Sequence, residues 1–188
     1  MATDPRSGLP ADLPVPVNDG ACAHLPGLRL PSVPLLSTAG GTVDLAALPG
    51  RTVVYCYPRT GRPGEPLPTG WELIPGARGC TPQACAFRDR HGDFARRDVR
   101  VLGVSAQTPD EQAEAARRLG LPFDLLSDAR LDFARALRLP TFEVDGRAYL
   151  RRLTLIVRDG RVEHVFYPVF PPDRNPDEVL AWLDAQPM

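Results

Sequence analysis

Two cysteines stand close together in the segment GARGCTPQACAFRDR, which covers residues 76–90. Cys80 and Cys85 have four residues between them. A thiol pair at this spacing could cycle between dithiol and disulfide, could hold a metal ion, or could be two unrelated core residues. The residues around the pair indicate which of these three possibilities to expect.

The residues directly after Cys80, TPQ, are typical of a helix start, with Thr81 as N-cap and proline at the first helical position. Free amide N–H groups and the positive end of the helix dipole would then lie near the sulfur. Cysteine pKa values fall from about 8.5 to roughly 3.5–7.5 in such positions near cations, which favours a reactive thiolate. A buried structural thiol is the alternative, but a glycine-rich approach to a helix start is usually at the surface.

Cys85 lies five positions further along the same expected helix. Five residues turn an α-helix by about 500°, so the side chains would point about 140° apart and the Cα atoms would be roughly 8–9 Å apart. A disulfide needs Cα atoms within about 7 Å of each other. The pair can therefore bond only if the first helical turn unwinds. Cys85 could equally be a core residue.

A metal site finds little support in the rest of the sequence. Structural zinc typically has four ligands in close pairs. The other cysteines, Cys22 and Cys56, and the three histidines are isolated from one another. We therefore expect no metal, and we interpret Cys56, inside an apolar stretch, as a small core residue.

Strands and helices alternate around the cysteine pair. Capping signals and amphipathic spacing predict helices at about 82–97, 109–119, 128–138 (starting at Ser127) and 176–185. Short β-branched and aromatic stretches predict strands at 51–58, 99–106 and 123–127, and hairpins at 34–48 and 150–167. This order predicts an α/β domain of three layers, with a mixed central sheet flanked by helices. It is the order of a thioredoxin-like fold with an N-terminal hairpin extension.

Proline and glycine indicate the domain organisation. Prolines are dense at the start of the chain, so we expect a Pro-rich N-terminal arm over 1–30 and a single domain over 31–188. A second segment rich in both residues, 59–79, is a long loop directly ahead of Cys80. Loops of this length inside a domain are usually functional or mobile.

Composition excludes several classes of partner. A net charge of −1 gives no field for nucleic acid or an anionic membrane surface, and no apolar run is long enough to span a membrane. The N-terminus lacks the basic start and apolar core of a secretory signal, which predicts the cytoplasm. Persistent structural disulfides are uncommon there, so a close cysteine pair favours catalysis or metal binding.

Several segments resemble the Q-type peroxiredoxins, the bacterioferritin comigratory protein group. GCTPQACAFRDRH resembles their active-site pattern, Pro-Gly-Cys-Thr-x-Glu-Ala-Cys-x-Phe-Arg-Asp. VRVLGVSAQTPDEQAEAARRLGLPFDLLSD is similar to their Val-Leu-Gly-Val-Ser strand, capped helix and Leu-Pro-Phe-x-Leu-Leu-Ser-Asp segment. RRLTLIVRDGRV resembles their Arg-x-Thr-Phe strand and hairpin. The resemblance covers roughly residues 30 to 185.

The resemblance implies roles for individual residues. Cys80 would be the peroxidatic cysteine, Cys85 the resolving cysteine and Arg152 the catalytic arginine. On an expected strand over 150–157, Arg152 shares a face with Thr154 and Ile156, where it needs a partner. That partner could be a buried thiolate or a carboxylate at the sheet edge.

This chain departs from the family pattern at three positions. Ala77 and Leu73 stand where the family has a Thr or Ser and a Pro ahead of the peroxidatic cysteine. We interpret this as an insertion between Pro58 and Cys80, with Thr60 supplying the missing hydroxyl. Gln83 stands where the family favours Glu, and it can still form a hydrogen bond at a helix start.

The function implied by the resemblance is a thiol-dependent peroxidase that requires no metal or organic cofactor. The Cys80 thiolate would reduce hydrogen peroxide or an organic hydroperoxide and become a sulfenic acid, which Cys85 would resolve as an intramolecular disulfide. A thioredoxin or similar dithiol would recycle the monomeric enzyme.

Two other functions stay open. A thioredoxin-like protein disulfide exchanger would ignore peroxide, and it would more often carry Cys-x-x-Cys. A non-catalytic interaction protein on the same scaffold could use the loop 59–79 as a partner surface.

Overall fold

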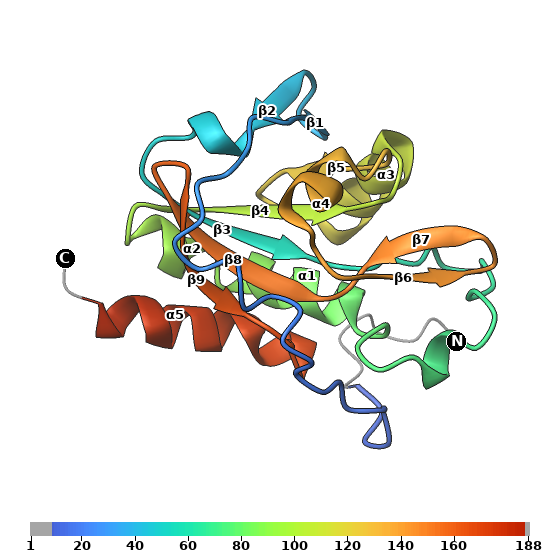
Figure 1. Ribbon diagram of the computed structural model, residues 1–188. Coiled ribbons are helices and arrows are strands. Elements are labelled where there is room, and N and C mark those ends of the chain that lie inside the picture. The colour runs from blue at the N-terminus through green and yellow to red at the C-terminus, as the bar shows by residue number, and fades with distance from the viewer. Residues whose placement is uncertain (1–8, 187–188) are drawn as a thin grey trace.

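A mixed sheet of seven strands, in the order β2-β1-β5-β4-β3-β8-β9, forms the centre of the molecule (Figure 1). The computed structural model describes residues 9–186, so the first part of the predicted arm, 1–8, lies outside the described residues. β3 pairs with β4 and β4 with β5 in parallel, and the other pairs are antiparallel. The strands are β1 (Pro34–Ser37), β2 (Thr42–Asp44), β3 (Arg51–Cys56), β4 (Val99–Ser105), β5 (Leu125–Ser127), β8 (Leu153–Arg158) and β9 (Arg161–Phe166).

Helices cover both faces of this sheet. They are α1 (Cys80–Asp89), α2 (His91–Ala95), α3 (Pro109–Leu119), α4 (Asp132–Leu137) and α5 (Asn175–Ala185). Because side chains alternate along a strand, β3 sends Val53 and Tyr55 into a core with α1, α2 and α5. It sends Val54 and Cys56 into a core with α4 on the other face. The predicted three layers and the core position of Cys56 are confirmed.

The predicted helix over 109–119 forms as expected. The Thr108 side chain accepts from the Glu111 amide, and the Glu111 carboxylate accepts from the Thr108 amide at 2.7 Å, which completes a capping box. Gly120 ends the helix in the left-handed conformation.

Two other helix predictions need correction. The helix expected over 82–97 is divided into α1 and α2 at Arg90, where φ is −95° and ψ is 1°. The helix expected from Ser127 begins later, at Asp132. Ser127 belongs to β5, and its hydroxyl donates to the Gln107 carbonyl oxygen at 2.6 Å, so it cannot cap a helix. The Asp128 carboxylate instead accepts from the first amides of α4.

A second sheet, a hairpin that we did not predict, supports the loop 59–79. Its strands are β6 (Thr141–Val144) and β7 (Arg147–Leu150). Trp71, from the loop, packs on Phe142 and Tyr149 of the hairpin with ring centroids 5.6 and 4.9 Å apart. Ala77 belongs to the same buried cluster. The hairpin therefore holds the end of the loop just ahead of Cys80.

The second half of the predicted arm belongs to the main core. Cys22, Leu25 and Leu30 are buried in the core cluster that includes α4. The Gly27 amide donates to the Val162 carbonyl oxygen in β9, and the Leu30 amide to the Gly160 carbonyl oxygen just before β9, both at 2.8 Å. This part of the arm is thus fixed along the sheet.

Candidate active site

Cys80 is the first residue of α1, and Gly79 holds the N-cap position. The prediction of Thr81 as N-cap was wrong, because Gly79 adopts a left-handed conformation (φ 102°, ψ 14°) that lets the helix start earlier. The Gly79 carbonyl oxygen accepts from the Gln83 amide at 3.0 Å. Cys80 therefore lies in the first turn, beside amide groups that have no partner within the helix.

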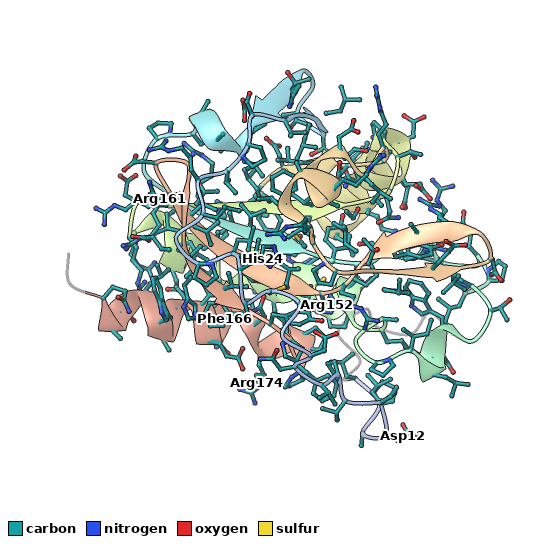
Figure 2. All side chains as sticks on the ribbon, viewed as in Figure 1. Asp12, His24, Arg152, Arg161, Phe166 and Arg174 are labelled. Atoms are coloured by element: carbon teal, nitrogen blue, oxygen red, sulfur yellow. The ribbon has the colours of Figure 1, made fainter. Side chains whose placement is uncertain are left out.

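Arg152 directly contacts the Cys80 sulfur. Its Nη2 donates to Cys80 Sγ at 3.1 Å, and both side chains are buried, at 3% and 5% exposure. Figure 2 shows Arg152 at the end of β8 that lies toward α1. A cation at this distance in a site of low solvent access stabilises a thiolate over a thiol. The predicted partnership between this arginine and a thiolate thus has the required geometry.

The position of Arg152 is fixed by neighbouring acceptors. Nη2 also donates to the carbonyl oxygens of Gly76, Ala77 and Arg78 at 3.2, 3.3 and 3.1 Å. Nη1 donates to the Gln83 side-chain oxygen. The strand predicted over 150–157 begins only at Leu153, so Arg152 precedes it in the chain. Within the described part of the chain, its partners are sulfur, carbonyl and amide atoms rather than a carboxylate at the sheet edge.

Cys85 is buried on a different side of α1. It packs with Ala84 and Leu119, whereas Cys80 packs with Tyr57 and Phe87. Within residues 9–186, none of the four cysteines forms a disulfide. The two side chains therefore face different clusters, as the helical spacing predicted.

Thr60 is buried at the start of the loop 59–79. Its amide donates to Gln107 Oε1 at 2.8 Å, and its carbonyl oxygen accepts from Gln107 Nε2 at 3.2 Å. These bonds connect the loop to Gln107, two residues after the end of β4. The proposed role of the Thr60 hydroxyl toward Cys80 stays a prediction.

Sequence reasoning missed two residues near the site. Tyr57 shares the Cys80 cluster, and burial raises the pKa of its hydroxyl, which keeps it neutral. Asn175, at the start of α5, accepts from Gln83 Nε2. The alternation of Tyr55 in β3 and Tyr57 just after it could have indicated the first. Nothing local in the sequence indicates the second.

The approach to Arg152 is lined by apolar side chains from the arm. Val15, Pro16 and Val17 line a cavity of about 260 Å³ together with Gly76 and Arg152. A small apolar group could therefore lie beside the arginine. Among residues 9–186, no cluster of His, Cys, Asp and Glu could hold a metal ion.

Gly79→Ala is expected to lower the free energy of unfolding by about 2–4 kcal/mol. The left-handed φ strains any L side chain, and a Cβ at this position would also run into Pro172. Gly64→Ala is the matched control, because Gly64 has φ +82° with nothing within 4 Å of the added carbon. Urea unfolding of both variants measures the difference. Equal losses would show that the Pro172 contact carries no cost.

Comparisons with known proteins show the family to which this chain belongs. A family model described as Redoxin matches residues 25–181. The chloroplastic peroxiredoxin Q of Populus jackii is 30% identical over 160 residues, which are 85% of this chain and 68% of that protein. The chloroplastic peroxiredoxin Q of Sedum lineare is 30% identical over 160 residues, which are 85% of this chain and 77% of that protein.

Solved structures show the same fold. Peroxidoxin BcpB from Mycobacterium tuberculosis superposes with a TM-score of 0.71 and 26% identity, covering 88% of this chain and 100% of that one. Peroxiredoxin Q of Xanthomonas campestris has a TM-score of 0.63 and 25% identity, covering 84% and 96%. The predicted thioredoxin-like α/β fold is confirmed.

The matches do not test where the protein resides. The plant relatives carry the word chloroplastic in their names, so the cytoplasmic location stays a prediction. No helix in residues 9–186 is long and apolar enough to cross a membrane.

Family membership implies a hydroperoxide as substrate and a thiol as reductant. The chain belongs to the Redoxin family and is a Q-type peroxiredoxin, a thiol-dependent peroxidase.

Proposed function

We propose that Cys80 is the peroxidatic cysteine and Arg152 the arginine that activates it. The observation that carries this assignment is the 3.1 Å contact between Arg152 Nη2 and Cys80 Sγ at the first turn of α1. Cys80 is also the first residue of α1, whereas Cys85 lies later in the same helix. Cys22 and Cys56 lie in the opposite core, where burial raises the pKa of both thiols.

In the first step the Cys80 thiolate attacks the terminal oxygen of a hydroperoxide, ROOH. The S–O bond forms as the O–O bond breaks, and the leaving oxygen takes a proton to give ROH, so cysteine is oxidised to a sulfenic acid. Arg152 and the free amides of α1 stabilise the charge that moves onto the leaving oxygen. Thr60 is proposed to orient the peroxide.

In the second step the Cys85 thiol attacks the Cys80 sulfenic acid, water leaves and a disulfide forms. Helical spacing and the separate clusters of the two thiols require the first turn of α1 to unwind before they meet. A thioredoxin or similar dithiol then reduces the disulfide by exchange. We propose that the monomer completes this cycle without a metal or an organic cofactor.

The test treats reduced protein with one equivalent of hydrogen peroxide and maps its disulfides by mass spectrometry. We expect a Cys80–Cys85 link, with Cys22 and Cys56 still reduced as internal controls. In Cys85→Ser, a dimedone adduct should accumulate on Cys80 instead. A link that joins Cys80 to any other cysteine would overturn the assignment of Cys85.

A parallel assay separates the proposed peroxidase from a disulfide exchanger. The same protein is offered hydrogen peroxide, an alkyl hydroperoxide and insulin disulfides. Consumption of either peroxide without insulin reduction supports the peroxidase. Insulin reduction without peroxide consumption contradicts it.

A further inference from the structure

A line of buried hydrogen bonds leads from Arg152 to the start of α5. Arg152 Nη1 donates to Gln83 Oε1, and Gln83 Nε2 donates to Asn175 Oδ1 at 3.0 Å. The Thr154 hydroxyl also donates to Asn175 Oδ1, at 2.7 Å. Gln83, Thr154 and Asn175 are completely buried, at 0% exposure. Asn175, the last residue in this series of hydrogen bonds, is 92 residues from Gln83 in the sequence.

The direction of these bonds follows from the arginine. A guanidinium has only donors, so Gln83 must turn its oxygen toward Arg152 and its nitrogen toward Asn175. Asn175 must then present its own oxygen, which also receives the Thr154 proton. As a result the Asn175 Nδ2 atom is buried without a partner. A buried donor without a partner is unfavourable, so the orientation of the Asn175 amide is set by Gln83 and Arg152.

The side chains that connect Arg152 to α5 by these hydrogen bonds, Gln83 and Asn175, are both neutral amides. Gln83 holds Nη1 by an amide oxygen, so it fixes the guanidinium without neutralising its positive charge. A carboxylate at the same position would compete with the Cys80 sulfur for that charge. The amide therefore leaves the electrostatic effect of Arg152 directed at the sulfur, 3.1 Å away.

We propose that Asn175 is a positioning residue for the peroxidase reaction. By holding the Gln83 amide in one orientation, it keeps an acceptor on Arg152 Nη1 and so keeps Nη2 on the Cys80 sulfur. The proposal rests on the assignment of Cys80 as the reactive cysteine. It links the C-terminal helix to the reactivity of a thiol at the start of α1.

The test compares Asn175→Leu with Asn175→Asp. Leucine has a similar volume but no acceptor, whereas aspartate keeps an oxygen for Gln83 and Thr154. We expect Asn175→Leu to lower the second-order rate with hydrogen peroxide at neutral pH by about 10-fold or more. The midpoint of the pH profile of Cys80 alkylation by iodoacetamide should move to higher pH, because the guanidinium is no longer held on the sulfur. Asn175→Asp should recover most of the rate.

Two further variants distinguish the proposed role from a loss of structure. Asp177→Asn changes the same turn of α5 at an exposed residue that pairs with Arg90, and should leave rate and midpoint unchanged. If Asn175→Leu does not fold, Gln83→Met removes the acceptor on Arg152 directly and should give the same two shifts.

Several outcomes would overturn the proposal. A slower rate with an unchanged alkylation midpoint would give Asn175 a structural role only. Wild-type values in Asn175→Leu would remove the role altogether, as would a failure of Asn175→Asp to recover activity in a protein that melts like wild type. If Cys80→Ser retains peroxidase activity, it is instead the assignment of Cys80 that fails.

Discussion

Cys80→Ser is expected to lower the second-order rate of peroxide consumption by at least about 10⁴-fold, because an alcohol is not ionised at neutral pH and cannot attack the O–O bond as a thiolate does. The smaller oxygen atom fits the same buried site, and the carbonyl acceptors of Arg152 remain in place. The fold should therefore survive. Loss of hydrogen peroxide under an excess of dithiol reductant measures the rate.

Cys22→Ala is the matched control for this variant. Cys22 has the same 5% exposure as Cys80, yet burial, together with nearby Asp19, raises its pKa to about 12, so its thiol stays protonated and inert. We expect Cys22→Ala to consume peroxide at the wild-type rate. Undiminished peroxide consumption by Cys80→Ser would reject Cys80 as the peroxidatic residue.

Arg152→Met is expected to lower the same rate by about 10²–10³-fold at neutral pH. Methionine removes the cation at the Cys80 sulfur and leaves the carbonyl oxygens of Gly76 and Ala77 without their donor. Arg152→Lys should recover only part of the rate. A single ammonium group cannot reach Gln83, the carbonyls and the sulfur together.

The pH dependence separates electrostatics from misfolding in this variant. Because the cation at the sulfur favours the charged form, the loss of rate in Arg152→Met should be larger at neutral pH than at high pH. Arg158→Met, at the exposed far end of β8, is the control and should behave like wild type. A parallel loss at every pH, with a lower melting temperature, would mean that Arg152 acts only in folding.

Local signals predicted much of this fold because the relevant forces act over short segments. The Thr108–Glu111 capping box and the alternation along β3 depend only on neighbouring residues. The cysteine spacing likewise predicted two thiols on different sides of α1. The β6–β7 hairpin was missed although its turn, Asp145-Gly146, is a recognisable hairpin signal.

The start of α5 shows why local signals were insufficient elsewhere. Asn-Pro-Asp-Glu predicts Asn175 as N-cap, with Glu178 completing a capping box. In the structure Asn175 is inside the helix, and Arg174 holds the cap position without a side-chain bond. The Asn175 oxygen is committed to Gln83 and Thr154, so a tertiary contact overrides the local capping preference. Such a contact is invisible to any short sequence window.

Trp71 makes the loop 59–79 depend on the β6–β7 hairpin, which limits how this protein can be redesigned. Its indole is 3% exposed only because Phe142 and Tyr149 of the hairpin cover it. The same cluster supports Ala77, whose carbonyl oxygen accepts from Arg152. A chimera that received the loop 59–79 without residues 141–150 would present a bare indole to solvent and lose the backing of its arginine. In any graft or deletion, the loop 59–79 and residues 141–150 must therefore be moved or removed together.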